Sequence, residues 1–532
     1  MKINEAKLKV LTRQVDSYRK GSLIIKSSFK PIDVINGIDW NYKHPDNQNT
    51  YQTYLHSLNF ITVFTELAVH NEDENLMKEI RNIILDWNKK NRSNDEKNYA
   101  WAEHPVASRI INIIYFQEHT RSYKLNKKIF NQIIIDHCEF LNNEKNYKMN
   151  NHGLMMDNAL LRASDYIGDA QLRKVYEEKA LYRIRLSLYR DFSRKGLHLE
   201  NSPEYHRMVI IIYRKIMNTL KEKGIKLDAQ FKNLYTLAED FKSYMIKPNL
   251  EYPMLGDTGQ IMEKNIVKRF SNLVDYDAGL AVLQRKSKVE LKNSTYLTFR
   301  CGYQSKTHKH LDDLSLTYYL NGHDLFIDPG KYSYDANEPI RKYLLSPKAH
   351  TTVSIKNKTY KLSNPFADSN DLKITKYYST KDYRIITGVN KLYENLNINR
   401  TVIITNDPAL IIIDRVISKD METIHQNFNL NPEAEIEKIS EERYKVKLNE
   451  RIYNIESLKL HNKELSSNVE KGFVSYKFAK YQENKRIVFE QSGKSTTFLT
   501  YVTEENIKVE NMKFENKLLN FTCNGQRYSI DL

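Results

Sequence analysis

The sequence predicts a multidomain α+β protein with an all-helical N-terminal domain and a C-terminal antiparallel β domain. In the first half, apolar residues recur at intervals of three and four positions, which is the period of amphipathic helices. From about Tyr296 onward they alternate at every second position, as in half-buried strands. The chain has 532 residues, enough for two large domains that each bury a core. We place the boundary in the charged stretch 285–293 and expect domains at 1–288 and 289–532.

The helical half shows a series of periodic segments separated by short polar loops. Gly224 ends the last of them, as glycine often does at a helix C-terminus. Helix follows helix without an intervening strand, an order typical of stacked helical hairpins. The segments are 54–70, 74–91, 105–119, 128–142, 154–167, 171–192 and 205–223.

The β half consists of short alternating segments joined by turn signals. Asn321-Gly322 lies between segments 314–320 and 325–328, and Asn-Gly favours the type I′ turn of a hairpin. Many short strands with such turns predict a sandwich or a barrel. Further predicted hairpins join 402–405 to 410–416, 444–448 to 452–455, and 518–523 to 527–530.

The composition is that of a folded, basic protein. Hydrophobic residues make up 40% and charged residues 28%, and the formal net charge is +16. This charge favours nucleic acid, a membrane surface or acidic polysaccharide as a partner, although a lysine-rich solvated surface would give the same total. The sequence has no helix-turn-helix, zinc-finger or RNP-like signature, so we expect no nucleic-acid partner. It has no run of 18 apolar residues, so we expect no membrane span.

The cysteines and the N-terminal residues bear on the cellular compartment. Cys138, Cys301 and Cys523 are scattered and have no CxxC spacing, so neither a disulfide framework nor a thiolate metal site is expected. The first residues lack the apolar segment of a signal peptide. As written, the chain would be cytoplasmic, and it would be secreted or periplasmic if a leader had been removed. No sequence feature indicates the oligomeric state.

The densest group of polar residues is THKHLDD at 307–313. In a strand, His308, His310 and Asp312 would point to the same face. Two imidazoles on one face bind a metal, or one binds it while the other does acid–base work. Asp328 and His350 would complete a His, Asp and His set, which suits zinc. The alternative is an exposed strand with two unrelated histidines.

Two further polar clusters stand at predicted helix starts. Asn151 and His152 precede the segment that begins at Leu154, where an asparagine is often only an N-cap. Tyr205 follows Ser-Pro-Glu, which is also a plain helix-start signal. Asp257, in a Gly-Asp-Thr turn, is interpreted as a structural carboxylate.

Four motifs along the chain, with the polar clusters above among them, resemble in their order those of the heparinase II/III-like polysaccharide lyases. That group includes heparin and heparan sulfate lyases, some hyaluronan and chondroitin lyases, and related alginate lyases. The resemblance covers most of the chain and implies an incomplete (α/α) toroid joined to an antiparallel β-sandwich, with a cleft between them. The motifs are NHGLM at 151–155, SPEYH at 202–206, HKHLDD at 308–313 and DPGKYSY at 328–334, and the change from helices to strands falls between the second and third.

The resemblance also implies roles for catalytic residues. Asn151 would hydrogen-bond the uronate carboxylate, and His152 and His308 would be candidate bases or carboxylate partners. Tyr205 would be the main acid. Relatives have a further tyrosine after the aspartate, and of the two competitors here we favour Tyr334 over Tyr332.

A zinc site is implied by the same resemblance. His310, Asp328 and His350 match the positions that hold a zinc ion in several relatives, where it is structural. The residues after His350 are Thr-Thr-Val, whereas Asn-Thr-Val is commoner in the family.

These residue types suit β-elimination from a uronate, and so the expected partner is an anionic polysaccharide. The C5 proton is only weakly acidic while the carboxylate stays charged, so a donor on that carboxylate must stabilise the developing enolate. A base then takes the proton and an acid protonates the departing O4. Tyr205 would do both if proton and leaving oxygen share a face of the sugar. Otherwise a histidine works from the opposite face.

Three other functions remain open. A glycoside hydrolase on a helical toroid would need two carboxylates, for which Glu200, Glu204 and Asp257 are available. A metal-dependent hydrolase would use the histidine strand at 308–312. A non-catalytic protein that binds acidic polysaccharide would need only the basic surface.

Overall fold

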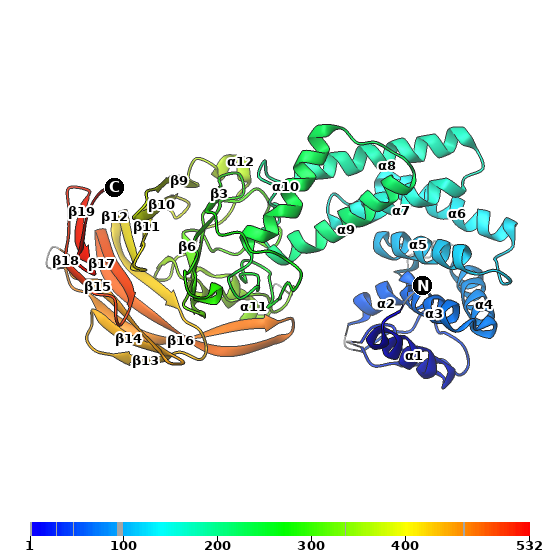
Figure 1. Cartoon of the computed structure of the whole chain (residues 1–532), viewed down its shortest axis with the longest axis horizontal. Helices are drawn as coiled ribbons and strands as arrows, with labels where there is room; N and C mark the ends of the chain where they lie inside the picture. The colour runs from blue at the N-terminus through cyan, green and yellow to red at the C-terminus, as the bar shows by residue number, and fades with distance from the viewer. Residues whose placement is uncertain (1–2, 28, 46, 93–98, 336, 461–462) are drawn as a thin grey trace. The chain divides into compact units, whose positions relative to one another are not determined.

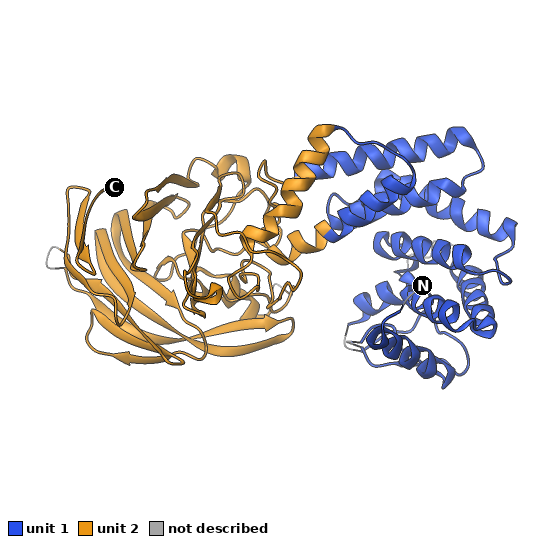
Figure 2. Cartoon of the chain, in the orientation of Figure 1, with its two compact units in different colours: residues 1–190, 211–228 blue, residues 191–210, 229–532 orange. Residues whose placement is uncertain are grey.

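The structure is a computed structural model that describes residues 3–27, 29–45, 47–92, 99–335, 337–460 and 463–532. The chain forms two compact units (Figure 2). Unit 1 comprises residues 1–190 and 211–228, and unit 2 comprises residues 191–210 and 229–532. Each unit is described by itself.

Unit 1 is helical, as the sequence predicts (Figure 1). In the described part of the chain, no helix is both long and apolar enough to cross a membrane. A two-stranded ladder of β1 (Ser22–Leu23) and β2 (Ile32–Asp33) accompanies the helices. The helices are α1 (Glu5–Arg19), α2 (Gln48–Ser57), α3 (Asn59–Asn71), α4 (Glu74–Asn91), α5 (Glu103–His119), α6 (Lys127–Asn142), α7 (Asn151–Ala163), α8 (Ala170–Asp191) and the later part of α9 (Pro203–Glu222).

The predicted helices are observed with one difference. The segment 54–70 is divided between α2 and α3 at Leu58, which is fully buried in a left-handed conformation with φ of 54°. Hydrophobic periodicity continues through such a break because both helices pack against α5. It therefore does not reveal the break.

The interior of unit 1 contains a buried cation. The guanidinium of Arg109 on α5 donates to His137 Nε2 at 2.9 Å and to the main-chain carbonyls of His56 and Ala100 at 2.9 and 2.8 Å. It also lies 3.8 Å from the centroid of the Trp87 ring. The carbonyl dipoles and the aromatic ring stabilise a charge that has no access to water.

In its described residues, unit 2 contains three antiparallel sheets, the first part of α9, and helices α10 (Ala229–Met245), α11 (Pro339–Leu345) and α12 (Pro365–Asp368). The five-stranded sheet is β3 (Leu273–Asp275), β4 (Leu280–Arg285), β5 (Thr295–Arg300), β6 (Ser315–Leu320) and β7 (His323–Phe326). The ten-stranded sheet is β8 (Val353–Ile355), β9 (Leu372–Ser379), β10 (Tyr383–Asn390), β11 (Leu396–Thr405), β12 (Leu410–Asn429), β13 (Glu435–Lys438), β14 (Arg443–Leu448), β15 (Arg451–Leu458), β16 (Ser466–Lys477) and β17 (Lys480–Glu504). The three-stranded sheet is β18 (Val509–Glu515), β19 (Leu518–Cys523) and β20 (Gln526–Asp531).

The sheets pack as layers of a sandwich. One core lies between the five-stranded and ten-stranded sheets and includes Phe299, Leu316 and Ile412. A second core joins the ten-stranded sheet to the three-stranded sheet through Ile411 and Phe521. Alternate residues of β12 thus enter different cores, which is the two-residue period that predicts strands in the sequence.

All four predicted hairpins are present, as β6–β7, β11–β12, β14–β15 and β19–β20. Asn321 and Gly322 have φ of 50° and 96°, as a type I′ turn requires. The predicted domain boundary at 288–289 falls between β4 and β5, which pair in one sheet. β3 and β4 are short and followed by a charged loop, so their alternation is weak in the sequence.

Candidate active site

Three predicted catalytic residues meet in unit 2. Tyr205 stands in the first turn of α9, His308 in the loop 301–314 between β5 and β6, and Tyr334 in the segment after β7. The Tyr205 and His308 rings are stacked with centroids 3.6 Å apart, and the Tyr205 and Tyr334 hydroxyls are hydrogen-bonded at 2.8 Å. Tyr334 is 52% exposed, so the group opens to solvent on that side. Tyr332 instead packs edge-on against Tyr481.

Both phenols of this group are proton donors at neutral pH. Burial, and then the hydrogen bond with Tyr334, raise the pKa of Tyr205 well above its ordinary value. Burial also raises the pKa of Tyr334, although its bond with Tyr205 acts in the opposite direction. A phenol with a raised pKa holds its proton until a stronger base is generated beside it.

Asp257 is the electrostatic centre behind this group. Its buried carboxylate accepts from His308 Nδ1 at 3.0 Å, from His310 Nε2 at 3.1 Å, and from both terminal nitrogens of Arg341 on α11. Burial alone would raise the pKa of Asp257, but the hydrogen bonds from His308 and His310 and the Arg341 guanidinium together hold it far below its usual range. Asp257 is therefore a fixed anion that orients two imidazoles.

The loop that carries His308 is fixed by close main-chain packing. His308 itself has a left-handed backbone with φ of 58°. The Asn201 side chain donates to the carbonyls of Ser305 and Thr307 at 2.6 and 2.9 Å. A Cβ on Gly256 would lie 2.6 Å from the carbonyl oxygens of both Asn201 and His308, so only glycine fits there.

Glu204 connects the segments that hold the two tyrosines. Its carboxylate accepts from the Gly259 amide at 2.9 Å and forms an ion pair with Lys331. Gly259 lies two residues after Asp257, and Lys331 three residues before Tyr334. The start of α9 is thereby joined to both neighbouring segments.

The predicted strand at 307–313 is wrong, because these residues form a loop. His308 and His310 do share a partner in Asp257, but Asp312 pairs with Arg300 and Lys309 in the interior. The left-handed residue at 308 interrupts the extended backbone, and sequence alternation does not report a single positive φ.

The three predicted zinc ligands lie close together in the interior of unit 2. His350 Nδ1 donates to Asp328 at 2.8 Å, and the His310 and His350 rings are 5.4 Å apart. Among the described residues, His310 Nδ1, Asp328 Oδ2 and His350 Nε2 are buried without a hydrogen-bond partner. The donor types suit zinc. In the described ranges, however, no three His, Cys, Asp or Glu side chains are arranged as they stand to hold a metal ion.

The other two predicted catalytic residues, Asn151 and His152, belong to unit 1. They open α7, whose N-cap is Asn150, so the N-cap alternative applies to the residue before them. His152 Nδ1 donates to Glu103 at 3.0 Å. A Cβ on Gly153 would lie 1.9 Å from the Lys148 carbonyl oxygen, so the turn into α7 requires glycine. That Asn151 and His152 converge with Tyr205 around one sugar stays a prediction.

Sequence reasoning missed three partners at the site: Asp257 for His308 and His310, Arg341 for Asp257, and Glu103 for His152. The Gly-Asp-Thr turn predicts only a structural carboxylate at Asp257, although the nearby glycines indicate that the backbone packs closely there. Arg341 gave no signal, because a single arginine on a short helix is ordinary. No sequence pattern marks Glu103, the partner of His152, either.

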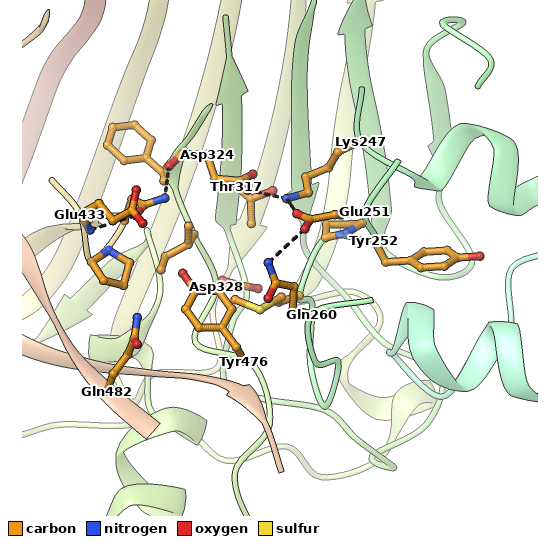
Figure 3. Close-up of a pocket in the computed structure, with 16 residues that line it drawn as sticks. Lys247, Glu251, Tyr252, Gln260, Thr317, Asp324, Asp328, Glu433, Tyr476 and Gln482 are labelled. Atoms are coloured by element: carbon orange, nitrogen blue, oxygen red, sulfur yellow. Dashed lines mark hydrogen bonds and ion pairs between the residues drawn. The ribbon is translucent and has the colours of Figure 1, made fainter. Parts of the chain in front are cut away.

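A separate pocket of about 300 Å³ lies in unit 2 (Figure 3). Lys247 pairs there with Glu251 at 3.1 Å and with Asp324, so its charge is neutralised. Asp328 and Tyr476 also line the pocket. Its acidic lining does not suit a polyanion.

Two family models match the chain. The heparinase II/III N-terminus model matches residues 4–279, and the heparinase II/III-like C-terminal model matches residues 276–509. A heparin-sulfate lyase of Pedobacter heparinus is 21% identical over 88% of this chain and 75% of its own length. A heparin-sulfate lyase of Bacteroides stercoris is 21% identical over 93% of this chain and 83% of its own length.

Solved structures share the fold. A heparan sulfate lyase of Pedobacter heparinus superposes with a TM-score of 0.78 at 17% identity, covering 100% of this chain and 90% of that chain. A heparinase III structure gives 0.81 at 16% identity, covering 99% and 91%. This confirms the predicted helical toroid followed by an antiparallel β-sandwich. Fold and relatives define a polysaccharide lyase. The chain belongs to the heparinase II/III family.

Proposed function

We propose that this chain is a carbon–oxygen lyase that cleaves a uronate-containing polysaccharide by β-elimination and leaves an unsaturated uronate at the new end. The observation that carries the proposal is the group of Tyr205, His308 and Tyr334. It presents two phenol hydroxyls 2.8 Å apart beside an imidazole stacked on Tyr205. Elimination needs such a proton donor next to a second titratable group.

Each residue of the group has a role in the proposed reaction. Tyr205 protonates the departing O4, and the Tyr334 hydroxyl orients the Tyr205 hydroxyl through their hydrogen bond. Asp257 holds His308 through Nδ1, which leaves Nε2 for the substrate; this nitrogen lies 3.8 Å from a carboxylate oxygen of Glu200. His308 then acts as the base or as the donor to the uronate carboxylate, according to which face of the sugar carries the C5 proton.

We propose that Asn151 and His152, in unit 1, have the roles that the family resemblance implies. The Asn151 amide is a neutral donor for the uronate carboxylate, where charge develops as the C5 proton leaves. Glu103 holds His152 through Nδ1, in the same way that Asp257 holds His308. Both histidines thus present Nε2 and have their orientation fixed by a carboxylate.

As the substrate we propose a glycosaminoglycan of the heparan sulfate type. Two relatives are named heparin-sulfate lyases, and the net charge of +16 favours a polyanion.

We also propose that His310, Asp328 and His350 bind a structural zinc ion. Zinc would join the loop 301–314 to the segments that carry Asp328 and His350. Asp257, on the other nitrogen of His310, would orient that ligand.

Each carboxylate that a glycoside hydrolase would use already has a partner, and that of Glu200 lies 3.8 Å from His308 Nε2. Glu204 is bound by Lys331 and the Gly259 amide, and Asp257 by Arg341 and two imidazoles. A general acid in a hydrolase needs a carboxyl with a raised pKa, whereas that of Asp257 is lowered.

The test is an assay of the purified chain on heparan sulfate, hyaluronan, chondroitin and alginate for the ultraviolet absorbance of unsaturated uronate. We expect product from at least one polymer. Tyr205→Phe should lower kcat by about 10²- to 10⁴-fold with little change in substrate binding, because only the transferable proton is lost. Tyr378→Phe, an exposed tyrosine on β9, is the matched control and should retain activity. Cleavage products without a double bond, or a fully active Tyr205→Phe, would contradict the proposal.

A further inference from the structure

A row of side chains in unit 1 extends away from His152. The His104 ring lies 5.5 Å from the His152 ring, and the Tyr54 ring lies 6.1 Å beyond that of His104. At the end of the row, the Lys26 ammonium donates to the Tyr54 hydroxyl at 2.8 Å and sits 4.1 Å from its ring centroid. The row takes one side chain each from the loop between β1 and β2, from α2, from α5 and from α7.

The far end of the row is positively charged. In the described ranges, no carboxylate pairs with the exposed Lys26 ammonium, whose contacts are with Tyr54. The nearest acid on the row, Glu103, is bound to His152. A cation held in place against an aromatic ring keeps its remaining N–H donors available for an anion.

The middle of the row is neutral and polar. Burial lowers the pKa of His104 to about 4, so its imidazole carries no charge near neutral pH. Its Nδ1 is buried without a hydrogen-bond partner among the described residues. A neutral imidazole and a phenol ring suit the hydroxyls and the apolar face of a sugar, whereas the ends of the row suit its acidic groups.

We infer that Lys26, Tyr54 and His104 form a second anion-binding subsite, which takes a carboxylate or sulfate of the sugar next to the one being cleaved. The inference rests on the proposed function in placing the reacting uronate at Asn151 and His152. In an acidic polysaccharide the negative groups recur along the chain. A cation at a fixed separation from His152 therefore selects a polymer with matching charge spacing. Tyr54 holds the Lys26 ammonium in place for this contact.

The test measures binding without turnover, in the Tyr205→Phe background. Lys26→Met removes the charge and keeps the length of the side chain, and Lys9→Met, on the exposed face of α1, is the matched control. Affinity for heparan sulfate and for its fully desulfated form is measured by titration calorimetry. We expect Lys26→Met to weaken binding about fivefold or more relative to Lys9→Met, the effect of one charge-assisted contact. Tyr54→Phe should weaken it by less.

The outcomes show whether the bound anion is a carboxylate or a sulfate, and they distinguish failure of the subsite from failure of the elimination mechanism. Weaker binding of both polymers supports a uronate carboxylate at Lys26, and weaker binding of the sulfated form alone supports a sulfate. Equal affinities of the Lys26→Met and Lys9→Met variants, with unchanged melting temperatures, overturn the subsite. Should wild type release no unsaturated product while Lys26→Met still weakens binding, the elimination mechanism fails and the subsite stands.

Discussion

At the level of single residues, Asp257 determines the state of two histidines at once. It accepts the Nδ1 proton of His308 and the Nε2 proton of His310, so the two rings are held in opposite tautomers. His308 is left with Nε2 for chemistry, and His310 with Nδ1 for a metal. Arg341 neutralises the carboxylate from behind, which stabilises the buried anion.

The proposed zinc site gives a prediction for one residue. His310→Ala should lower the zinc content to well below one per chain and lower the melting temperature, because a ligand and a buried contact are both lost. His425→Ala removes another buried histidine, on β12, and should lower stability without changing the metal content. Metal analysis of the purified proteins with thermal melts checks both. Equal zinc content in wild type and His310→Ala would remove His310 from the ligand set.

At the level of elements, the candidate site consists of loops fastened to regular structure. The start of α9, the turn at 256–260, the loop 301–314 and the segment after β7 each supply one part. They are joined by Glu204 and Asn201 through main-chain and ion-pair contacts. Loops fixed on a rigid sheet hold the catalytic groups in contact with one another and leave the Tyr334 side of the group open to solvent.

Gly256→Ala tests this arrangement. The new Cβ would meet two carbonyl oxygens at 2.6 Å on a backbone with φ of 53°, so the turn and Asp257 must shift. We expect a loss of kcat of at least about tenfold, since small displacements of catalytic groups are costly, with a lower melting temperature. Gly168→Ala, which has open space and no positive φ, is the control and should behave as wild type. An active and equally stable Gly256→Ala would show that the turn does not position the site.

At the level of the whole molecule, a buried carboxyl group in unit 1 makes the stability depend on pH. In unit 1, Asp157 on α7 accepts from the Tyr147 hydroxyl at 2.8 Å, and Arg183 lies 3.6 Å away. Arg183 donates to the main-chain carbonyl of Leu141 and compensates the carboxylate only in part. Burial outweighs these contacts and raises the pKa of Asp157 to about 8.

The sign of the resulting pH dependence follows from proton binding. Between about pH 4 and about pH 8 the folded carboxyl holds a proton that the unfolded one has released, so this group makes the protein less stable as pH rises. Asp157→Asn should remove a slope of at most about 1.4 kcal/mol per pH unit, and its stability relative to wild type should therefore increase across that window. Thermal melts at several pH values check this. Parallel profiles would show that Asp157 is ionised in the folded state.

The sequence by itself determined the helical and β halves, the four hairpins, the family and the residues proposed for catalysis. Hydrophobic periodicity, turn residues and the order of motifs are properties of the sequence, so they predict the elements and the family without a structure. The break at Leu58 and the loop at 307–313 escaped because a single residue with positive φ leaves the apolar pattern unchanged.

Only the tertiary structure decided which side chains touch. It brought Tyr334 rather than Tyr332 to Tyr205, and it made Asp257 the partner of two histidines and Arg341 the partner of Asp257. These residues are separated by tens of positions along the chain. Their contacts depend on where the sheet and loops place them in space, and the spacing of residues along the chain does not predict those positions.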